Sequence, residues 1–367
     1  MSSYRTLLTA AIFIGLIIPA QAPAMEFAIV GPRAAGMGGA GVAVTTDSLA
    51  TYWNPAGLAM TQTVDIRTQF SVQGVDRRGL IDTIEDITST PIASAQTQEL
   101  LARINTGGSL SAVATGGLYF KGYIGEHAIG FNLSDVATAG SFVLENFTAP
   151  GNSIFGKLAF RGLEARQAAF SYAYAFADKT FSIGVTGKVI QGAAYIGTAA
   201  VTGGEGVTLS DKFGKPTIST AFGIDLGAIY RPSSWLQFGL VAKDLNQPKF
   251  DAPDGTMFKL VPQIRGGVAI IPYSSLTLTG DVDMTSNKTL VPGQKSQMLS
   301  LGAEQTLLSE FLSLRVGAFK NIQDAASPIT PTAGVGLRIY AFRADAGGGY
   351  DFREQGVLGS LSLSLTF

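Results

Sequence analysis

The residues nearest to a known chemical motif lie close to the N-terminus. Gly36-Met37-Gly38-Gly39-Ala40-Gly41 matches G-x-G-x-x-G, the pattern that cradles a dinucleotide pyrophosphate. That chemistry needs a strand before the first glycine, a helix after the last, and an acid about 20 residues on. Here Pro32-Arg33-Ala34-Ala35 follows the short apolar run Phe27–Val30, and Asn54-Pro55-Ala56-Gly57 contains no acid. We therefore expect no nucleotide site and no cofactor.

Catalytic and metal-binding side chains are scarce in the rest of the chain. Cys is absent, His127 is the only histidine, and no G-x-S-x-G elbow occurs. One histidine is a poor basis for a metal cluster or a Ser–His triad. The formal net charge of −1 offers no basic excess for nucleic acid. The sequence predicts neither an enzyme, nor a metal site, nor a nucleic-acid binder.

The remaining charges of interest lie inside segments where polar and apolar residues alternate. In Val64–Val72, Ile66, Phe70 and Val72 oppose polar neighbours, which is the period of a β-strand. A charge on the lipid face of a membrane barrel costs about 2–4 kcal/mol at mid-depth, so charges should point inward. The interpretation is a paired interior network that grips a plug, and the alternative is a solute-selecting ring. The residues are Arg67, Lys188, Asp225, Lys243, Arg265, Asp281, Arg315, Arg338 and Asp345.

The elements that position these charges form a series of strands. Fourteen strand-like runs extend from Val64–Val75 to Val357–Phe367, and no apolar stretch of about 18 residues follows the leader. The connections alternate between long and short, as in outer-membrane barrels with short periplasmic turns. The sequence predicts an all-β fold, a 14-stranded antiparallel transmembrane β-barrel over residues 62–367 in outer-membrane lipid.

Strand ends carry further membrane signals. Aromatic residues lie toward these ends, as an interfacial girdle requires: Tyr172, Tyr174, Tyr230, Trp235, Tyr273 and Tyr340. The last strand alternates apolar and hydroxyl residues up to the C-terminus. We expect Leu363, Leu365 and Phe367 to be the signal that the barrel-assembly machinery recognises.

Two long connections stand out. Gly79–Ile104 has helical spacing and is split by Pro91, which predicts a short helical extracellular loop. It is either a cap on the barrel mouth or a ligand or partner surface. The second long connection, Ala137–Leu163, carries a cluster that could line a ligand groove or simply pack: Phe142, Leu144, Phe147 and Phe155.

The N-terminal region divides into a leader and a plug. Arg5, the apolar run Leu7–Ile18 and Ala22-Pro23-Ala24 predict a signal peptide over residues 1–24, cleaved after Ala24. Residues 25–61 are glycine-dense and fit neither a strand nor a stable helix, so they predict a hatch inside the barrel. Its candidate residues are Gly31, Arg33, Gly36, Gly38, Gly39, Gly41, Asn54, Pro55, Ala56 and Gly57. The protein is expected in the outer membrane of a Gram-negative-type bacterium.

The segment Gly31–Ala43, followed by Tyr52-Trp53-Asn54-Pro55-Ala56-Gly57-Leu58, resembles the mature start of FadL/TodX-type outer-membrane transporters. This resemblance implies a 14-stranded barrel with an N-terminal hatch and passive uptake of long-chain fatty acids or other hydrophobic compounds. It also implies a kinked third strand that opens a side exit. Gly130, Asn132, Ser134 and Asp135 in the third strand would permit such a kink.

Later segments resemble a different branch of the same superfamily. Gly239–Asn246, Pro262–Ala269, Leu301–Glu304 and Leu314–Gly317 are similar to plasmid conjugal-transfer TraF-like barrels, and PorV-like secretion barrels share the fold. This resemblance implies a component of conjugal transfer or protein secretion that binds a protein partner. Uptake of a hydrophobic ligand and binding of a protein partner are therefore both open hypotheses.

Overall fold

The computed structural model describes residues 27–89, 94–150, 153–203 and 212–367. The expected signal peptide with its cleavage site after Ala24, and Pro91, lie outside these residues. Among the described residues, no helix is long and apolar enough to cross a membrane.

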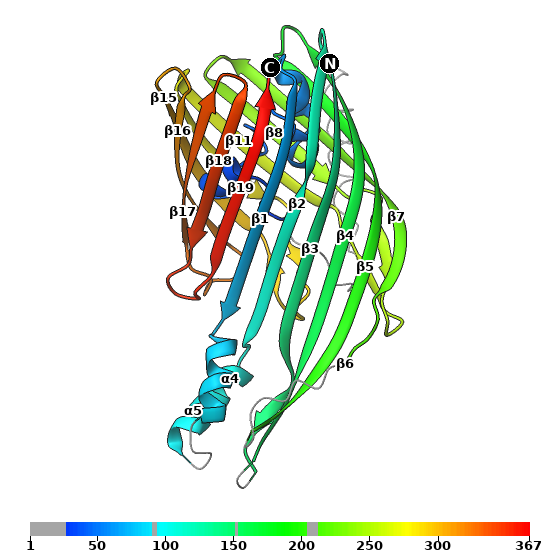
Figure 1. Cartoon of the computed structure of the whole chain (residues 1–367), viewed down its shortest axis with the longest axis vertical. Coiled ribbons are helices and arrows are strands. Elements are labelled where there is room, and N and C mark those ends of the chain that lie inside the picture. Colours follow the sequence, from blue (N-terminus) through cyan, green and yellow to red (C-terminus); the bar gives the residue numbers. More distant parts are fainter. Residues whose placement is uncertain (1–26, 90–93, 151–152, 204–211) are drawn as a thin grey trace, which may run out of the picture.

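The strands form a closed antiparallel barrel (Figure 1). β1 pairs with both β2 and β19, and β4 pairs with β5, so the 14-stranded barrel expected from the sequence is confirmed. Alternation sets the register: from Asp65 onward, buried polar residues alternate with exposed residues such as Ile66. The barrel strands are β1 Asp65–Arg77, β2 Ser109–Ile124, β3 His127–Thr148, β4 Ile154–Phe176, β5 Phe181–Gly203, β7 Thr217–Ser233, β8 Leu236–Lys243, β11 Gln263–Tyr273, β12 Leu276–Asp283, β15 Met298–Leu307, β16 Leu312–Asn321, β17 Thr330–Ile339, β18 Phe342–Tyr350 and β19 Val357–Thr366.

The longer connections lie at the end of the barrel opposite the C-terminus. The helices α4 (Leu80–Ser89) and α5 (Ala95–Asn105) form the expected helical loop and project from this end in Figure 1. Two other connections contain short antiparallel strand pairs. β9 (Lys249–Asp251) pairs with β10 (Met257–Lys259), and β13 (Asn287–Lys288) pairs with β14 (Lys295–Ser296). β6 (Lys212–Phe213) pairs with β5.

The prediction of a second long loop over Ala137–Leu163 is wrong. β3 and β4 continue through it as a paired hairpin, and β5 extends with them to Gly203. Sequence periodicity missed this because Ala137-Thr138-Ala139-Gly140 has little hydrophobic contrast, whereas cross-strand pairing satisfies its backbone. We call the extended parts of β3, β4 and β5, residues 136–148, 154–164 and 191–203, the wing.

The lipid-facing band ends where the wing begins. On β3 the outward positions are the apolar Ile129, Phe131 and Leu133, and then Asp135. Asp135 Oδ2 lies 3.6 Å from Nε of Arg166 on β4. Since outward charges are costly at mid-depth, this ion pair indicates the outer boundary of the lipid band.

A hatch fills the lumen of the barrel. It contains α2 (Pro32–Gly36), α3 (Ala50–Trp53) and a 3₁₀ turn, η1 (Pro55–Met60). α2 packs against β16 to β19, and η1 packs against β3, β4, β5 and β7. The hatch therefore reaches walls that are far apart in the sheet order.

Candidate functional site: the hatch and the lumen

The hatch has an aromatic core of its own. Trp53 Nε1 donates to the Val30 carbonyl at 2.8 Å, and the Tyr52 hydroxyl donates to the Ala28 carbonyl at 3.0 Å. The Phe27 ring centroid lies 5.3 Å from that of Trp53 and 5.8 Å from that of Tyr52. These contacts hold the two ends of residues 27–53 together and do not involve the barrel wall.

The Asn54-Pro55-Ala56 triplet turns the chain and fixes it to the wall. Asn54 Oδ1 accepts from the Ala56 N–H at 3.2 Å and so caps η1, while Pro55 takes the first helical position. Asn54 Nδ2 donates to the carbonyls of Val42 in the hatch at 3.0 Å and Ala228 on β7 at 3.1 Å. One side chain thus joins two hatch segments and one strand.

Barrel glycines admit the hatch backbone. A Cβ added at any of seven inward glycines would lie only 2.0–2.6 Å from a hatch atom. At Gly317, for example, it would lie 2.4 Å from the Gly38 nitrogen. We call this set the glycine belt: Gly130, Gly184, Gly227, Gly239, Gly302, Gly317 and Gly347. Sequence reasoning missed the belt, although glycine inside a strand is a signal of close backbone approach.

Single polar side chains of the wall hold the hatch backbone. Asp281 Oδ2 accepts from the N–H groups of Gly41 at 2.7 Å and Val42 at 2.8 Å. Thr332 Oγ1 accepts from the Gly38 N–H at 2.9 Å. Lys121 Nζ donates to the Thr61 carbonyl at 2.9 Å and reaches Thr46 as well. These barrel side chains therefore satisfy several backbone groups of the irregular hatch.

An ionic network connects the hatch to strands on one side of the barrel. Glu304 binds Arg33 of the hatch and Arg315 of β16, each at 2.6 Å. Arg315 continues to Asp345 at 2.8 Å. From there Arg67 lies 3.7 Å from Asp345. Arg67 also pairs with Asp47 of the hatch at 3.0 Å, so the network begins and ends on the hatch.

Other expected lumen charges form a second group. Lys188 Nζ lies 2.9 Å from Asp225 Oδ1 and 2.8 Å from Asp244 Oδ1. Arg265 lies 2.6 Å from Asp283 and stacks on the Phe27 ring, with Cζ 3.9 Å from the centroid.

Two expected lumen charges behave differently. Arg338 does not join the interior network: its side chain is 38% exposed and it pairs with Glu310 in a turn, because β17 ends one residue later. Lys243 is buried but rests on rings, with Nζ 3.3 Å from the Tyr52 centroid and 4.5 Å from that of Phe27.

An apolar chamber lies between the hatch and the outer connections. Its walls include Val136, Leu163 and Ile190, which are buried in one cluster with hatch residues. The β9–β10 hairpin folds inward and buries Phe250 and Phe258 in the same cluster. A residual cavity of about 40 Å³ remains, lined by Tyr52, Ile190, Lys243 and Leu260 among others.

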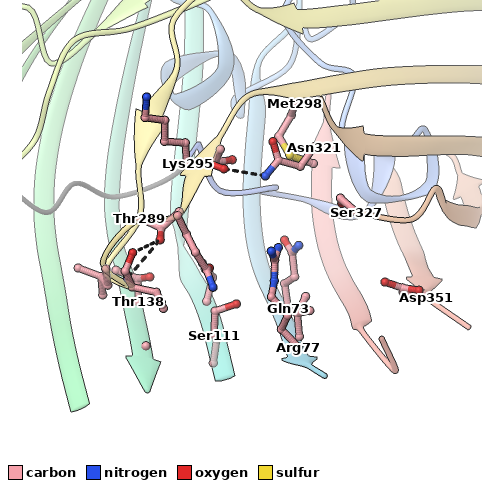
Figure 2. A pocket seen from close by; sticks show the side chains of 18 of the residues that line it. Gln73, Arg77, Ser111, Thr138, Thr289, Lys295, Met298, Asn321, Ser327 and Asp351 are labelled. Atoms are coloured by element: carbon pink, nitrogen blue, oxygen red, sulfur yellow. Dashed lines mark hydrogen bonds between the residues drawn. The ribbon is translucent and has the colours of Figure 1, made fainter. Parts of the chain in front are cut away.

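A second cavity of about 110 Å³ lies nearer the outer end and has a mixed lining (Figure 2). Gln73, Ser111, Thr138 and Asn321 come from strands, and Thr289 comes from the β13–β14 connection. The β13–β14 connection is tied across the lumen, since Gln294 Nε2 donates to Ser109 Oγ on β2 at 2.8 Å. The outer cavity therefore has both polar and apolar walls, whereas the cluster of buried side chains below it is apolar.

The four residues expected to line a groove are not brought together. Phe142 is buried beside Val291, and Phe147 is buried in a cluster with helix residues including Leu100. Leu144 and Phe155 point outward and are 49% and 48% exposed. Regular alternation would place Phe142 and Leu144 on the same face, but the register of β3 against β4 shifts between Val143 and Glu145, and Leu144 points outward.

The third strand has no side opening at the expected place. β3 pairs residue by residue with β4 from His127 to Val143, and with β2 from His127 to Phe142. Register shifts occur only at Val143/Glu145 and Glu145/Thr148, in the wing. Instead, the hatch packs closely against Gly130, since a Cβ there would lie 2.4 Å from Thr51 Cγ2.

The comparisons with known proteins agree with this architecture. The family model described as "F plasmid transfer operon, TraF, protein" matches residues 51–283, more than half of the chain. The chain belongs to this TraF family. No curated protein matches it.

Solved structures similar to this TraF family member are described as a hydrocarbon channel, a toluene transporter and a FadL homologue. The CymD monoaromatic hydrocarbon channel is 12% identical, with TM-score 0.59 over 94% of this chain and 98% of that one. The Ralstonia pickettii toluene transporter TbuX is 13% identical, with TM-score 0.55 over 92% and 97%. A Pseudomonas aeruginosa FadL homologue is 13% identical, with TM-score 0.53 over 95% and 99%. At these identities the likeness establishes a FadL/TodX-like β-barrel fold.

Proposed function

We propose that this TraF family member takes up hydrophobic small molecules passively across the outer membrane. The observation that carries the proposal is the apolar chamber of Val136, Leu163, Ile190, Phe250 and Phe258 in the middle of an otherwise polar lumen. Burial of apolar surface there would bind a solute at about 25 cal/mol per Å². The printed names of similar structures, hydrocarbon channels and a toluene transporter, support the same substrate class.

The proposed route begins at the outer cavity and ends in the chamber. The hatch is held by Asp281, by the Arg33–Glu304 pair and by the glycine belt, so a straight path into the periplasm is blocked. The solute would leave the chamber through a local rearrangement of the wall or the hatch. We also propose that residues 1–24 are removed as a signal peptide, and that Leu363, Leu365 and Phe367 guide barrel assembly.

The test combines purification and permeation. Mass spectrometry of the detergent-extracted mature protein should find an apolar compound in stoichiometric amount. Proteoliposomes containing the protein should admit a hydrophobic solute faster than liposomes containing an unrelated barrel. An empty barrel with no permeation above that control would refute uptake.

A second candidate function is a component of conjugal transfer or secretion that binds a protein. The specific observation is the wing, which rises beyond the lipid band and packs against α5 through Phe147, Leu100 and Ile104. A permanent plug and a raised surface suit a docking platform. Cross-linking from cysteines placed on the outward residues Leu144 and Phe155 would test it in a chain that has no other cysteine. A reproducible protein partner, together with no uptake, would favour this function over the first.

A further inference from the structure

The connection between β12 and β15, residues 284–297, crosses the whole lumen. We call it the strap, and it contains the short strands β13 and β14. Around the 14-stranded barrel, β12 is seven strands from β2 in either direction, and β15 is seven strands from β3. The strap starts from β12 and β15, and its tip contacts β2 and β3. It therefore spans the barrel along a diameter.

The tip of the strap rests in a small seat on the far wall. Gln294 Nε2 donates to Ser109 Oγ on β2 at 2.8 Å, and among the hydrogen bonds of the described residues this is the one that joins the tip to that wall. Leu290 and Val291 are buried. A Cβ added at Gly140 on β3 would lie 3.3 Å from Leu290 Cβ and 3.2 Å from Val291 Cγ2. The tip is therefore held by one side-chain hydrogen bond and by apolar packing against a bare stretch of backbone.

The roots of the strap are held by more hydrogen bonds than its tip. Gln297 Nε2 donates to the Asp283 carbonyl at 2.8 Å, and the Met298 N–H donates to Asp283 Oδ2 at 2.8 Å. Asn321 of β16 donates through Nδ2 to the Lys295 carbonyl at 2.8 Å (Figure 2). The strap can therefore release its tip while its ends stay in the wall.

The tip is a turn closed by its own hydrogen bonds. The Val291 N–H donates to Thr289 Oγ1 at 3.1 Å, and the Gln294 N–H donates to the Val291 carbonyl at 3.2 Å. Between the tip and the roots, β13 and β14 pair over two positions, and at one of them Lys288 faces Lys295. Facing like charges weaken a ladder, and a ribbon of two strands is marginally stable by itself. A closed turn on a weak stem can move as one body.

In its seat the strap narrows the outer route. Its residues in the lining of the 110 Å³ cavity are Thr289, Leu290, Val291, Gln294, Lys295 and Ser296 (Figure 2). The rest of the lining comes from β1 to β3 on one side and from β15 to β17 and nearby connections on the other. A cavity of about 150 Å³ is known to bind benzene, so the space beside the strap is too small for a ring-sized solute.

We propose that the strap is the outer gate of the barrel for ring-sized apolar solutes. The gate opens when Gln294 leaves Ser109 and the tip leaves Gly140, while the roots stay in place. Local opening of this kind uses the least firmly held part of an element. This inference rests on the proposed uptake function and adds the segment that controls entry.

Opening of the tip is measured first, without transport. The chain has no cysteine, so Leu290→Cys gives a single thiol that is buried while the tip is seated. Its labelling by N-ethylmaleimide in lipid nanodiscs should become at least fivefold faster when Ser109→Ala removes the hydrogen bond. Ser111→Ala is the matched control and should leave the rate unchanged, since Ser111 lines the same cavity on β2 but Gln294 binds Ser109. Equal rates in the two backgrounds would overturn the gate.

A second thiol shows that the effect is local. Ile229→Cys places the cysteine on β7, buried against the hatch. Ser109→Ala should leave its labelling rate unchanged, because the strap does not cover it. An equal increase at Ile229→Cys and Leu290→Cys would indicate loosening of the whole barrel and overturn the gate.

A disulfide across the seat tests whether uptake needs the opening. In Gly140→Cys with Leu290→Cys the two Cβ atoms would lie 3.3 Å apart, close to the roughly 3.5–4.5 Å of natural disulfides. Oxidation should lower permeation of a hydrophobic solute into proteoliposomes at least tenfold, and a reductant should restore it. Each single-cysteine variant is a control and should show no effect of redox state. Equal permeation with and without the disulfide, whose formation mass spectrometry verifies, would overturn the gate.

The two kinds of measurement separate the gate from the function beneath it. Permeation that the disulfide does not change would overturn the gate and leave uptake standing. Labelling that follows the expected pattern, with no permeation through the native protein, would support a movable strap and overturn uptake.

Discussion

Asp281 offers the sharpest test of how the hatch is held. Its Oδ2 accepts from the N–H groups of Gly41 at 2.7 Å and Val42 at 2.8 Å, and its side chain is buried. Asp281→Ala would leave both donors buried without a partner. An unsatisfied buried donor costs about 1–3 kcal/mol, so the pair costs at least about 2 kcal/mol of local hatch stability.

That free energy converts into a rate of hydrogen exchange. Since about 1.4 kcal/mol is a factor of ten, the amides of Gly41 and Val42 should exchange roughly 30-fold faster in the variant. Mass spectrometry of a peptide covering these residues measures the effect, and β-barrel peptides from the same digest provide the internal reference. Asp281→Asn is the matched control, because its amide oxygen can still accept from both groups. Exchange in Asp281→Ala within threefold of the native rate would refute the reasoning.

Three further predictions concern packing, charge and pH. Gly317→Ala should lower the free energy of unfolding by about 1–3 kcal/mol, because the added Cβ meets the hatch backbone. Gly116→Ala is the control and should not lower it, because the added Cβ would lie 3.7 Å from its nearest neighbour, Phe70 Cδ2. Thermal unfolding in detergent measures both variants. Arg315→Met should lower the free energy of unfolding by about 3 kcal/mol, because the buried carboxylates of Glu304 and Asp345 lose the cation they share. Arg338→Met at the rim should change it by less than about 1 kcal/mol. Similar unfolding midpoints for the two variants would contradict the buried network. Asp324 lies in the connection after β16: burial alone would raise its pKa, but the Ala326 N–H and the Arg77 guanidinium lower it below the usual 3.8. Its stabilisation is therefore present above about pH 4 and lost as the pH falls through the depressed pKa, so proteolysis of this connection should increase at pH 3, and Asp324→Asn should remove that pH dependence.

Much of the candidate site could be anticipated from residue types. A charged side chain in a strand of a membrane barrel costs free energy if it faces lipid and little if it faces the lumen. Alternation alone therefore assigns Arg67, Arg315 and Asp345 to the lumen. Arg338 obeys the same alternation, yet it lies next to a turn and pairs with Glu310 outside the network. Depth along a strand, which sequence does not give, decides whether an inward charge is buried.

The groove residues show the opposite limit. Phe142 and Phe147 were grouped with Leu144 and Phe155 because all four are apolar and near in sequence. Once β3 and β4 pair through this region, the register shifts at Val143/Glu145 and Glu145/Thr148 decide which of these side chains face inward, and Phe142 and Leu144 point to opposite sides. The grouping could not survive a change from loop to strand.

The sequence by itself determined the architecture. Period-two alternation, the parity of long and short connections and the glycine-dense N-terminal segment each follow from local chemistry, and together they leave a plugged 14-stranded barrel. Only the tertiary structure decided which glycines form the belt, that Phe250 is buried in the chamber, and that Lys243 rests on the rings of Phe27 and Tyr52. These are relations between residues far apart in the chain, such as Gly317 and Gly38, and they are set by strand register and by how the hatch sits in the lumen.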